Sequence, residues 1–276
     1  MSEIRESLQV RIYPAPTPTV PTVVYLPGLH GDWTLISACR EILRNRVRFV
    51  EVTYPRSVTW TLTDYAAAIE EALLQKGVGH AWILGESFGS QVLWELVKRG
   101  RLHWDGLILA GGFVNYPYPR LLSLARALFA VTPPRWIQAI LPLYAAYARV
   151  RYRGKPELIQ GADEFVRRRT PEDLLAWGRR LELIANNDPR SIALANRTPV
   201  HHLYGFWDPI VPWMPVASWL HEFCPALRGS RRVTTADHTV LATGAEESAQ
   251  QICQWISGRE TPLRCFPRAT SRQASG

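Results

Sequence analysis

The sequence has few cysteines and none of the arrangements that would give them a structural role. Its four cysteines, Cys39, Cys224, Cys253 and Cys265, show neither a Cys-x-x-Cys pair nor the Cys/His spacing of a zinc site. We therefore expect neither a disulfide framework nor a bound metal, and free thiols of this kind are typical of a reducing compartment.

Long apolar runs are missing as well. No segment reaches the roughly 18 uncharged apolar residues of a transmembrane helix. The longest candidate, Trp136 to Ala148, is shorter and contains Pro142. Residues 1–7 have no apolar core of the kind that a signal peptide needs. These absences predict a cytoplasmic protein without a transmembrane segment.

Lysine is rare, so the positive charge of the chain comes almost entirely from arginine. The formal net charge is +8, yet lysine occurs only at positions 76, 98 and 155. The arginines are scattered and do not form a run with interleaved aromatics, which argues against nucleic-acid binding. A basic surface attracted to acidic substrates or anionic lipid is the simpler interpretation, and it is compatible with peripheral membrane contact. The sequence does not indicate an oligomeric state.

The first part of the chain alternates between strand and helix patterns. Apolar or β-branched runs predict strands at residues 8–13, 22–26, 47–52, 81–84 and 105–109. Helical spacing predicts helices at residues 33–43, 64–76 and 91–97, the first of them capped by Asp32. This alternation predicts an α/β fold in which helices cover both faces of a mostly parallel sheet. In such sheets ligands bind beyond the carboxyl ends of the strands.

The alternation is then interrupted by helical patterns alone. The interrupting helices are predicted at residues 121–129, 136–148, 157–168 and 171–184. Strands at 200–204 and 231–234 and helices at 216–223 and 245–256 follow. We expect residues 1–115 and 199–257 to form one core, 116–198 a helical cap over the site, and 258–276 a disordered tail. The cap aromatics, Trp136, Tyr144, Tyr147 and Trp177, are expected mostly to pack between helices, with a minority lining a pocket.

The stretch Ala81-Trp82-Ile83-Leu84-Gly85-Glu86-Ser87-Phe88-Gly89-Ser90 joins a strand pattern to a helix pattern through a Gly-x-Ser-x-Gly turn. This context is typical of a nucleophile elbow. Side chains at Gly85 and Gly89 would collide with the neighbouring strand and helix. The turn would raise the Ser87 hydroxyl above the sheet edge, at the positive end of the next helix. Taken alone, the residues also fit a plain strand-to-helix connection.

A serine hydroxyl needs a base to take its proton and an acid to orient that base. Asp208 lies in a turn after the predicted strand 200–204, and His238 follows the predicted strand 231–234. Both are therefore expected at the sheet edge that carries Ser87. Asp237 is an alternative acid, but as the immediate neighbour of His238 it should point elsewhere.

A tetrahedral intermediate also needs backbone donors for its oxyanion. The residue after the nucleophile, Phe88, is expected to supply one N–H. The second is expected from the turn after strand 22–26, where Gly28 lets the backbone turn inward and Leu29 is the expected donor. His30 is the alternative donor, because the phase of this turn is not fixed by the sequence.

These motifs together resemble the α/β-hydrolase superfamily over residues 8–256. Leu26-Pro27-Gly28-Leu29-His30-Gly31 and Gly85-Glu86-Ser87-Phe88-Gly89 are similar to a bacterial branch with an LPGLDG-type oxyanion loop and an ESF-type elbow. Plant esterase/acyltransferases that act on diacylglycerol and phytol carry related motifs. The chain departs from this branch with His30 in place of an Asp and Ser90 in place of a second glycine. The resemblance implies a serine hydrolase with a helical cap.

A serine nucleophile favours an ester or thioester substrate, and the apolar cap favours an apolar acyl group. His30, Phe113 and Trp207 are the residues expected to contact such a small-molecule substrate. The predicted function is ester hydrolysis by Ser87, His238 and Asp208 without metal or organic cofactor. An acyltransferase with the same acyl-enzyme is the alternative, and a non-catalytic binding protein is a third hypothesis.

Overall fold

The computed structural model describes residues 7–15 and 17–258, so residues 259–276 of the predicted disordered tail lie outside the described part. The described chain forms a seven-stranded sheet with the order β1-β3-β2-β4-β5-β6-β7. Its strands are β1 (Gln9–Ile12), β2 (Thr22–Leu26), β3 (Arg48–Thr53), β4 (His80–Glu86), β5 (His103–Ala110), β6 (Val200–Gly205) and β7 (Leu227–Val233). Only the β1–β3 pair is antiparallel among these pairings. The predicted α/β class with a mostly parallel sheet is confirmed.

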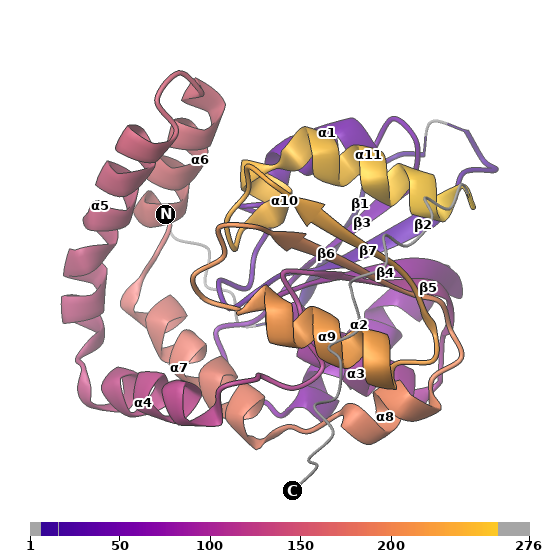
Figure 1. Cartoon of the computed structure of the whole chain (residues 1–276), viewed down its shortest axis with the longest axis horizontal. Coiled ribbons are helices and arrows are strands. Elements are labelled where there is room, and N and C mark those ends of the chain that lie inside the picture. The colour runs from indigo at the N-terminus through magenta and orange to yellow at the C-terminus, as the bar shows by residue number, and fades with distance from the viewer. Residues whose placement is uncertain (1–6, 16, 259–276) are drawn as a thin grey trace, which may run out of the picture.

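Helices cover both faces of this sheet (Figure 1). They are α1 (Ser37–Leu43), α2 (Leu62–Gln75), α3 (Gly89–Arg99), α9 (Trp213–Phe223), α10 (Val240–Thr243) and α11 (Ala245–Ile256). Alternate residues of β2 enter two separate hydrophobic clusters: Val24 and Leu26 pack with α2, α3 and α9, whereas Val23 and Tyr25 pack with α1 and α11. Burial on both faces explains why β2 is a continuous apolar run rather than an alternating one.

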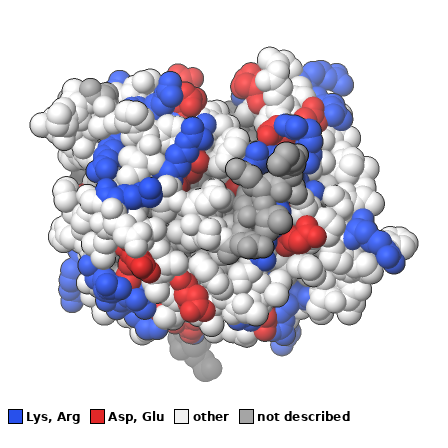
Figure 2. Space-filling model, turned by 180° about the vertical axis from the view of Figure 1, so that it is seen from behind, with Lys and Arg blue, Asp and Glu red and all other residues white. Residues whose placement is uncertain are grey.

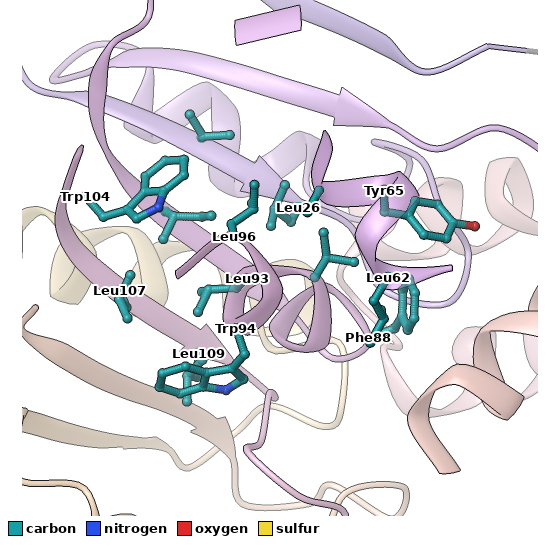
Figure 3. Close-up of a cluster of buried hydrophobic side chains, with 14 of the residues drawn as sticks. Leu26, Leu62, Tyr65, Phe88, Leu93, Trp94, Leu96, Trp104, Leu107 and Leu109 are labelled. Carbon is teal, nitrogen blue, oxygen red and sulfur yellow. The ribbon is translucent and has the colours of Figure 1, made fainter. Parts of the chain in front are cut away.

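The cluster beneath α2 and α3 is the larger of the two, and it supports the predicted elbow (Figure 3). Phe88, the residue after Ser87, is fully buried in it, with its ring 5.8 Å from Tyr65 and 5.9 Å from Tyr54. Burying an aromatic side chain of this size contributes about 2–3 kcal/mol relative to exposing it. The backbone that follows Ser87 is thereby held by the core.

The first predicted helix is wrong at its beginning. α1 starts at Ser37 rather than Trp33, and its N-cap is Ile36, which makes no side-chain cap. Asp32 instead accepts hydrogen bonds from the backbone N–H and the hydroxyl of Thr34, which close a local turn. Its second carboxylate oxygen faces an arginine from a distant part of the chain, described below. Asp32, which the sequence pattern predicted as a helix cap, therefore makes a local turn and a tertiary contact instead.

Five helices lie between β5 and β6, and most of them stand beside the sheet (Figure 1). They are α4 (Pro119–Val131), α5 (Pro134–Arg151), α6 (Pro156–Arg167), α7 (Pro171–Asn186) and α8 (Arg190–Ala195). The first four begin at a proline, whose fixed φ suits the first helical position and whose missing N–H costs nothing there. The short α8 was not predicted from the sequence, and it contacts α3. Within the described residues, no helix combines the length and apolar composition needed to cross a membrane.

Two adjacent histidines of β6 are buried and predict a pH-dependent stability. Burial lowers the pKa of His202 to about 3, and burial together with Arg228 lowers that of His201 to about 4, from an ordinary value of 6.5. Below pH 6.5 the unfolded chain therefore binds more protons than the folded one, so the free energy of unfolding falls as the pH falls. We expect a loss of about 1.4 kcal/mol per pH unit for each such histidine between pH 6 and pH 5.

Urea unfolding at several pH values measures this effect. His202→Gln should give a shallower pH dependence than the wild type, whatever its absolute stability. His103→Gln, at the exposed start of β5, is the matched control. Equal slopes in the wild type and His202→Gln would contradict the prediction.

Candidate active site

Ser87 has the backbone geometry of a sharp, strained turn. Its φ is +49°, and among the described residues it is the only non-glycine with a positive φ. A Cβ at Gly89 would lie 2.3 Å from the Leu26 carbonyl oxygen, and one at Gly85 would lie 3.0 Å from the Gly89 backbone. Both glycines are thus needed for β4 and α3 to meet at this turn. Such strain persists only where the surrounding structure holds it, which is the usual situation at functional sites.

Ser87, His238 and Asp208 form a continuous chain of hydrogen-bonding distances. The Ser87 Oγ lies 2.9 Å from His238 Nε2, and His238 Nδ1 lies 2.8 Å from Asp208 Oδ2. The three residues come from the turns after β4, β7 and β6, all at the carboxyl edge of the sheet. Ser87 is 8% exposed, so its hydroxyl is held in place but open to a small part of the solvent. The structure brings the three predicted residues together.

The carboxylate of Asp208 is oriented by its own loop. Its Oδ1 accepts hydrogen bonds from the backbone N–H groups of Ile210 and Val211, both at 2.8 Å. This leaves Oδ2 free to face the His238 ring. Backbone donors fix the rotamer of Asp208 independently of the histidine, so the acceptor is in place before the base is charged.

Asp237 points away from the triad, as expected. It accepts hydrogen bonds from Thr239 on its own loop and from Thr243 at the end of α10. Its other oxygen accepts the hydroxyl of Tyr152, which follows the last residue of α5. Asp237 therefore holds the loop that carries His238 and connects that loop to the helices inserted between β5 and β6.

The surroundings of His238 favour its charged form. Burial opposes protonation, but the charge and the hydrogen bond of Asp208, with smaller contributions from Glu86 and Asp237, raise the pKa of His238 above 6.5. Glu86, the residue before Ser87, is buried and its pKa is raised to about 7, mainly by burial. Glu86 accepts the hydroxyl of Tyr25 and lies 3.9 Å from His30 Nε2.

The predicted oxyanion loop lies directly against Ser87. A Cβ at Gly28 would be 3.4 Å from the Cβ of Ser87. The loop closes as a tight turn in which Gly31 N–H donates to Gly28 O at 3.0 Å, with Leu29 and His30 at its centre. Phe88 is the N-cap of α3, in a region where backbone N–H groups lack partners within the helix. Gly28, which precedes the predicted donor Leu29, and the second predicted donor Phe88 therefore both adjoin the nucleophile.

Two buried arginines that the sequence did not single out hold this loop from the outside. Arg180 of α7 donates to Leu29 O at 2.5 Å, to Pro55 O at 2.9 Å and to the Tyr65 hydroxyl at 3.3 Å. Arg169, just before α7, donates to His30 O at 3.1 Å and to Asp32 Oδ2 at 2.6 Å. A guanidinium can satisfy several acceptors at once, which a lysine cannot. The inserted helices thus fix the position of the predicted oxyanion loop.

The three residues predicted to contact substrate occupy different surroundings. His30 is buried, with its ring 6.1 Å from the Phe165 ring, and burial lowers its pKa to about 4. Phe113 is 1% exposed and belongs to the core, 5.6 Å from the Tyr116 ring. Trp207 is 59% exposed. The structure does not bring these three together, and their contact with substrate stays a prediction.

The departure at Ser90 has a local structural use. Its Oγ lies 2.6 Å from Ser87 O and accepts the backbone N–H of Phe113 at 3.1 Å. Ser90 therefore links the elbow to the turn after β5. As for metals, the described residues contain no group of three or more His, Cys, Asp or Glu placed to hold an ion.

Comparison with known proteins agrees with this fold. No protein-family model matches the sequence. The chain is 27% identical to the "Putative carbamate hydrolase RutD" of Cronobacter turicensis over 248 residues, which is 80% of this chain and 85% of that protein.

Solved structures match over nearly the whole length. An esterase from Thermogutta terrifontis has a TM-score of 0.72 at 19% identity, covering 92% of this chain and 94% of its own. The esterase EaEST from Exiguobacterium antarcticum has a TM-score of 0.72 at 15% identity, covering 91% and 95%. The chain therefore has the α/β-hydrolase fold.

The hydrogen bond between His238 and Asp208 predicts a measurable titration. In the wild type, the His238 imidazole should titrate above pH 6.5, and in Asp208→Asn its pKa should fall, because burial then acts without the compensating negative charge. NMR titration of the imidazole resonances, assigned with His238→Gln, measures both values. An unchanged pKa in Asp208→Asn would show that another carboxylate stabilises the imidazolium.

Proposed function

We propose that this protein is a serine hydrolase that cleaves carboxylic esters or thioesters with an apolar acyl group. The observation that carries the proposal is the Ser87–His238–Asp208 chain at 2.9 and 2.8 Å, built on the strained turn at Ser87. The pairing of a nucleophile with a base, and of that base with an orienting acid, is the arrangement that acyl transfer requires. Esterases among the solved structures with this fold support the same reaction class.

The reaction begins when the Ser87 Oγ attacks the substrate carbonyl carbon and its proton passes to His238 Nε2. Asp208 stabilises the imidazolium that forms and keeps Nδ1 as the proton donor to its carboxylate. The tetrahedral intermediate then collapses, the bond to the leaving alcohol or thiol breaks, and His238 returns the proton to that group. Water repeats the sequence on the acyl-enzyme and releases the acid and free Ser87.

The backbone N–H groups of Leu29 and Phe88 are proposed to hold the oxyanion during both steps. Such donors stabilise charge that exists only in the transition state, and removing one typically costs 10²–10³ in kcat. Arg180 withdraws the Leu29 carbonyl oxygen into the protein by hydrogen bonding to it. This contact fixes the Leu29–His30 peptide, whose N–H belongs to the alternative donor His30. The Leu29 N–H belongs to the preceding peptide, which is held by the hydrogen bond from Gly31 N–H to Gly28 O.

Residues 116–198 are proposed to be the cap over this site, as the sequence suggested, with a cytoplasmic location expected from the sequence. Tyr152 and Arg169 connect the inserted helices to the loops of His238 and His30 respectively. The sequence relative from Cronobacter turicensis is named as a carbamate hydrolase, and carbamate hydrolysis uses the same attack on a carbonyl carbon. A carbamate therefore belongs in the substrate panel, beside esters and thioesters.

Hydrolysis of p-nitrophenyl esters of increasing acyl length tests the proposal. Ser87→Ala should abolish turnover while keeping the fold, because the nucleophile is lost. Asp208→Asn should lower kcat by on the order of 10⁴, the size of the corresponding effect in a serine protease.

The rate should also fall on the acid side of a midpoint above pH 6.5, because only neutral His238 accepts the serine proton. Asp188→Asn is the matched control for Asp208→Asn, because Asp188 is an exposed aspartate that pairs with Arg190.

Two results would change the assignment. Serine-dependent labelling by a fluorophosphonate without ester hydrolysis would favour an acyltransferase, which product analysis with added alcohols or thiols would then reveal. Absence of labelling at Ser87 would favour a non-catalytic binding protein and contradict the proposal.

Arg180 is proposed to be a positioning residue for the oxyanion loop. Arg180→Lys should lower kcat about 10- to 100-fold with a smaller change in KM, because the misplaced donors matter most in the transition state. Arg179→Lys is the matched control, since Arg179 is the preceding residue of α7 and donates to Trp60 O and Glu182 instead. A change confined to KM, or equal effects in both variants, would show that Arg180 acts only on the fold.

A further inference from the structure

The outer faces of α4 and α5 carry two long stripes of exposed apolar side chains. The stripe of α4 consists of Leu121, Leu124, Leu128 and Val131, and that of α5 of Trp136, Ile140, Leu143, Tyr147 and Val150. Their spacings alternate between three and four residues, so each set lies on one face of its helix. Each of the nine residues is between 50% and 77% exposed.

These stripes lie opposite the faces that pack against the protein. Leu122 of α4 and Ala145 and Ala148 of α5 are buried, whereas the nine apolar residues of the stripes are exposed. The expectation that the cap aromatics mostly pack between helices is therefore wrong for Trp136 and Tyr147, which are 62% and 50% exposed. Leu and Trp side chains exposed in rows, rather than singly, mark a surface that another apolar phase covers.

The charge of the same segment has one sign. Residues 106–156 contain no Asp or Glu. Their charged side chains are all basic: Arg120, Arg126, Arg135, Arg149, Arg151, Arg153 and Lys155. In the view from behind, the side of the molecule on which the inserted helices lie is mostly white, with both basic and acidic side chains visible on it (Figure 2). The stripes are thus bordered by positive charge alone within their own segment.

The basic end of α5 lies beside the candidate active site. Arg151, Arg153 and Lys155 line a cavity of 480 Å³ together with Trp207, Thr234 and Thr235. Trp207 precedes Asp208 in the chain, and Tyr152 donates to Asp237, which precedes His238. A negatively charged surface held by these basic residues would therefore lie next to the loops that carry Asp208 and His238.

We propose that the outer face of α4 and α5, defined by the nine exposed apolar residues, docks onto an anionic lipid bilayer. Amphipathic helices with Trp and Leu on one face and basic flanks lie in the interface of such membranes, with the apolar face among the acyl chains. Basic residues beside an anionic leaflet add attraction that salt screens. The proposal concerns the outer face of α4 and α5 rather than Ser87 itself, and it stands independently of the proposed ester hydrolysis.

The charge pattern favours a membrane over a second copy of the chain. A two-fold interface places the same patch against itself. In this segment such an interface would bring the basic residues of both copies together, with no acidic residue from the segment to compensate them. An anionic bilayer supplies the opposite charge and the apolar phase together.

Co-sedimentation of the full chain with lipid vesicles tests this proposal. At low salt we expect binding to 3:1 phosphatidylcholine/phosphatidylglycerol vesicles at least tenfold stronger than to pure phosphatidylcholine vesicles, and weaker binding as salt is added. Trp136→Ser/Ile140→Ser/Leu143→Ser should reduce the affinity at least tenfold through the apolar contacts. Arg120→Gln/Arg135→Gln/Arg153→Gln should reduce it by a similar factor and flatten the salt dependence.

Matched controls separate this surface from general effects of charge and hydrophobicity. Leu74→Ser/Met214→Ser removes exposed apolar side chains of α2 and α9, and Arg46→Gln/Arg228→Gln removes exposed arginines elsewhere. Both control variants should bind as the wild type does. The urea midpoints of all variants, measured alongside, show that the fold is kept.

Three outcomes would overturn the proposal. They are equal binding to neutral and anionic vesicles, unchanged binding in the apolar variant, and a wild-type dimer in light scattering that the apolar variant converts to a monomer. The last would assign the stripes to self-association. None of these experiments measures turnover, so a failure of the membrane proposal is distinguishable from a failure of the proposed hydrolase function.

Discussion

The parallel alignment of β4, β6 and β7 is the constraint on which the candidate site depends. Because these strands run in one direction, the turns after them meet at one edge, and residues 151 positions apart, Ser87 and His238, come within 2.9 Å. The sheet alone does not orient them. The elbow sets Ser87, two backbone donors set the Asp208 carboxylate, and the hydrogen bonds of Asp237 set the loop of His238. Each side chain is therefore held in position by contacts of its own, independently of the other two.

The buried arginines raise a question of energy, because moving a guanidinium from water into a protein costs several kcal/mol unless its donors are satisfied. Arg169 has a carboxylate partner in Asp32 and carbonyl partners in His30 and Phe165. Arg180 relies on two carbonyl oxygens and a tyrosine hydroxyl. Burial of these two charges is tolerable only when the predicted oxyanion loop adopts one conformation. The two arginines therefore select that conformation of the loop rather than simply adding stability. Specificity of this kind is the best-supported use of buried charged groups.

The sequence predicted the fold, and it predicted that Ser87, Asp208 and His238 lie at one edge of the sheet, because the signals for both are local. Apolar runs identify strands, Gly85 and Gly89 identify the turn, and the order Ser87, Asp208, His238 needs only the strand positions. It did not identify Arg169 and Arg180, because nothing local distinguishes these two arginines from those on the surface: each acts on residues more than 100 positions away. The same limit explains the error at Asp32. A carboxylate before a helix pattern predicts a cap, and only the folded chain shows that Arg169 and Thr34 use it instead.

Arginine thus serves two purposes in this chain, and both follow from its chemistry. Inside, a planar group with five donors can reach several carbonyl oxygens of a loop at once, which the single ammonium of lysine cannot. Outside, on α4 and α5, an arginine keeps its charge at any pH and is less strongly hydrated than lysine, so it suits a surface that meets phosphate groups. The inserted helices therefore contact the oxyanion loop on one side and carry the proposed membrane surface on the other. A bilayer that fixes α5 would act on the His238 loop through Tyr152 and Asp237, because these two residues are joined by a hydrogen bond. Docking and the position of the proposed catalytic base would then be physically connected through a contact that the free protein already contains.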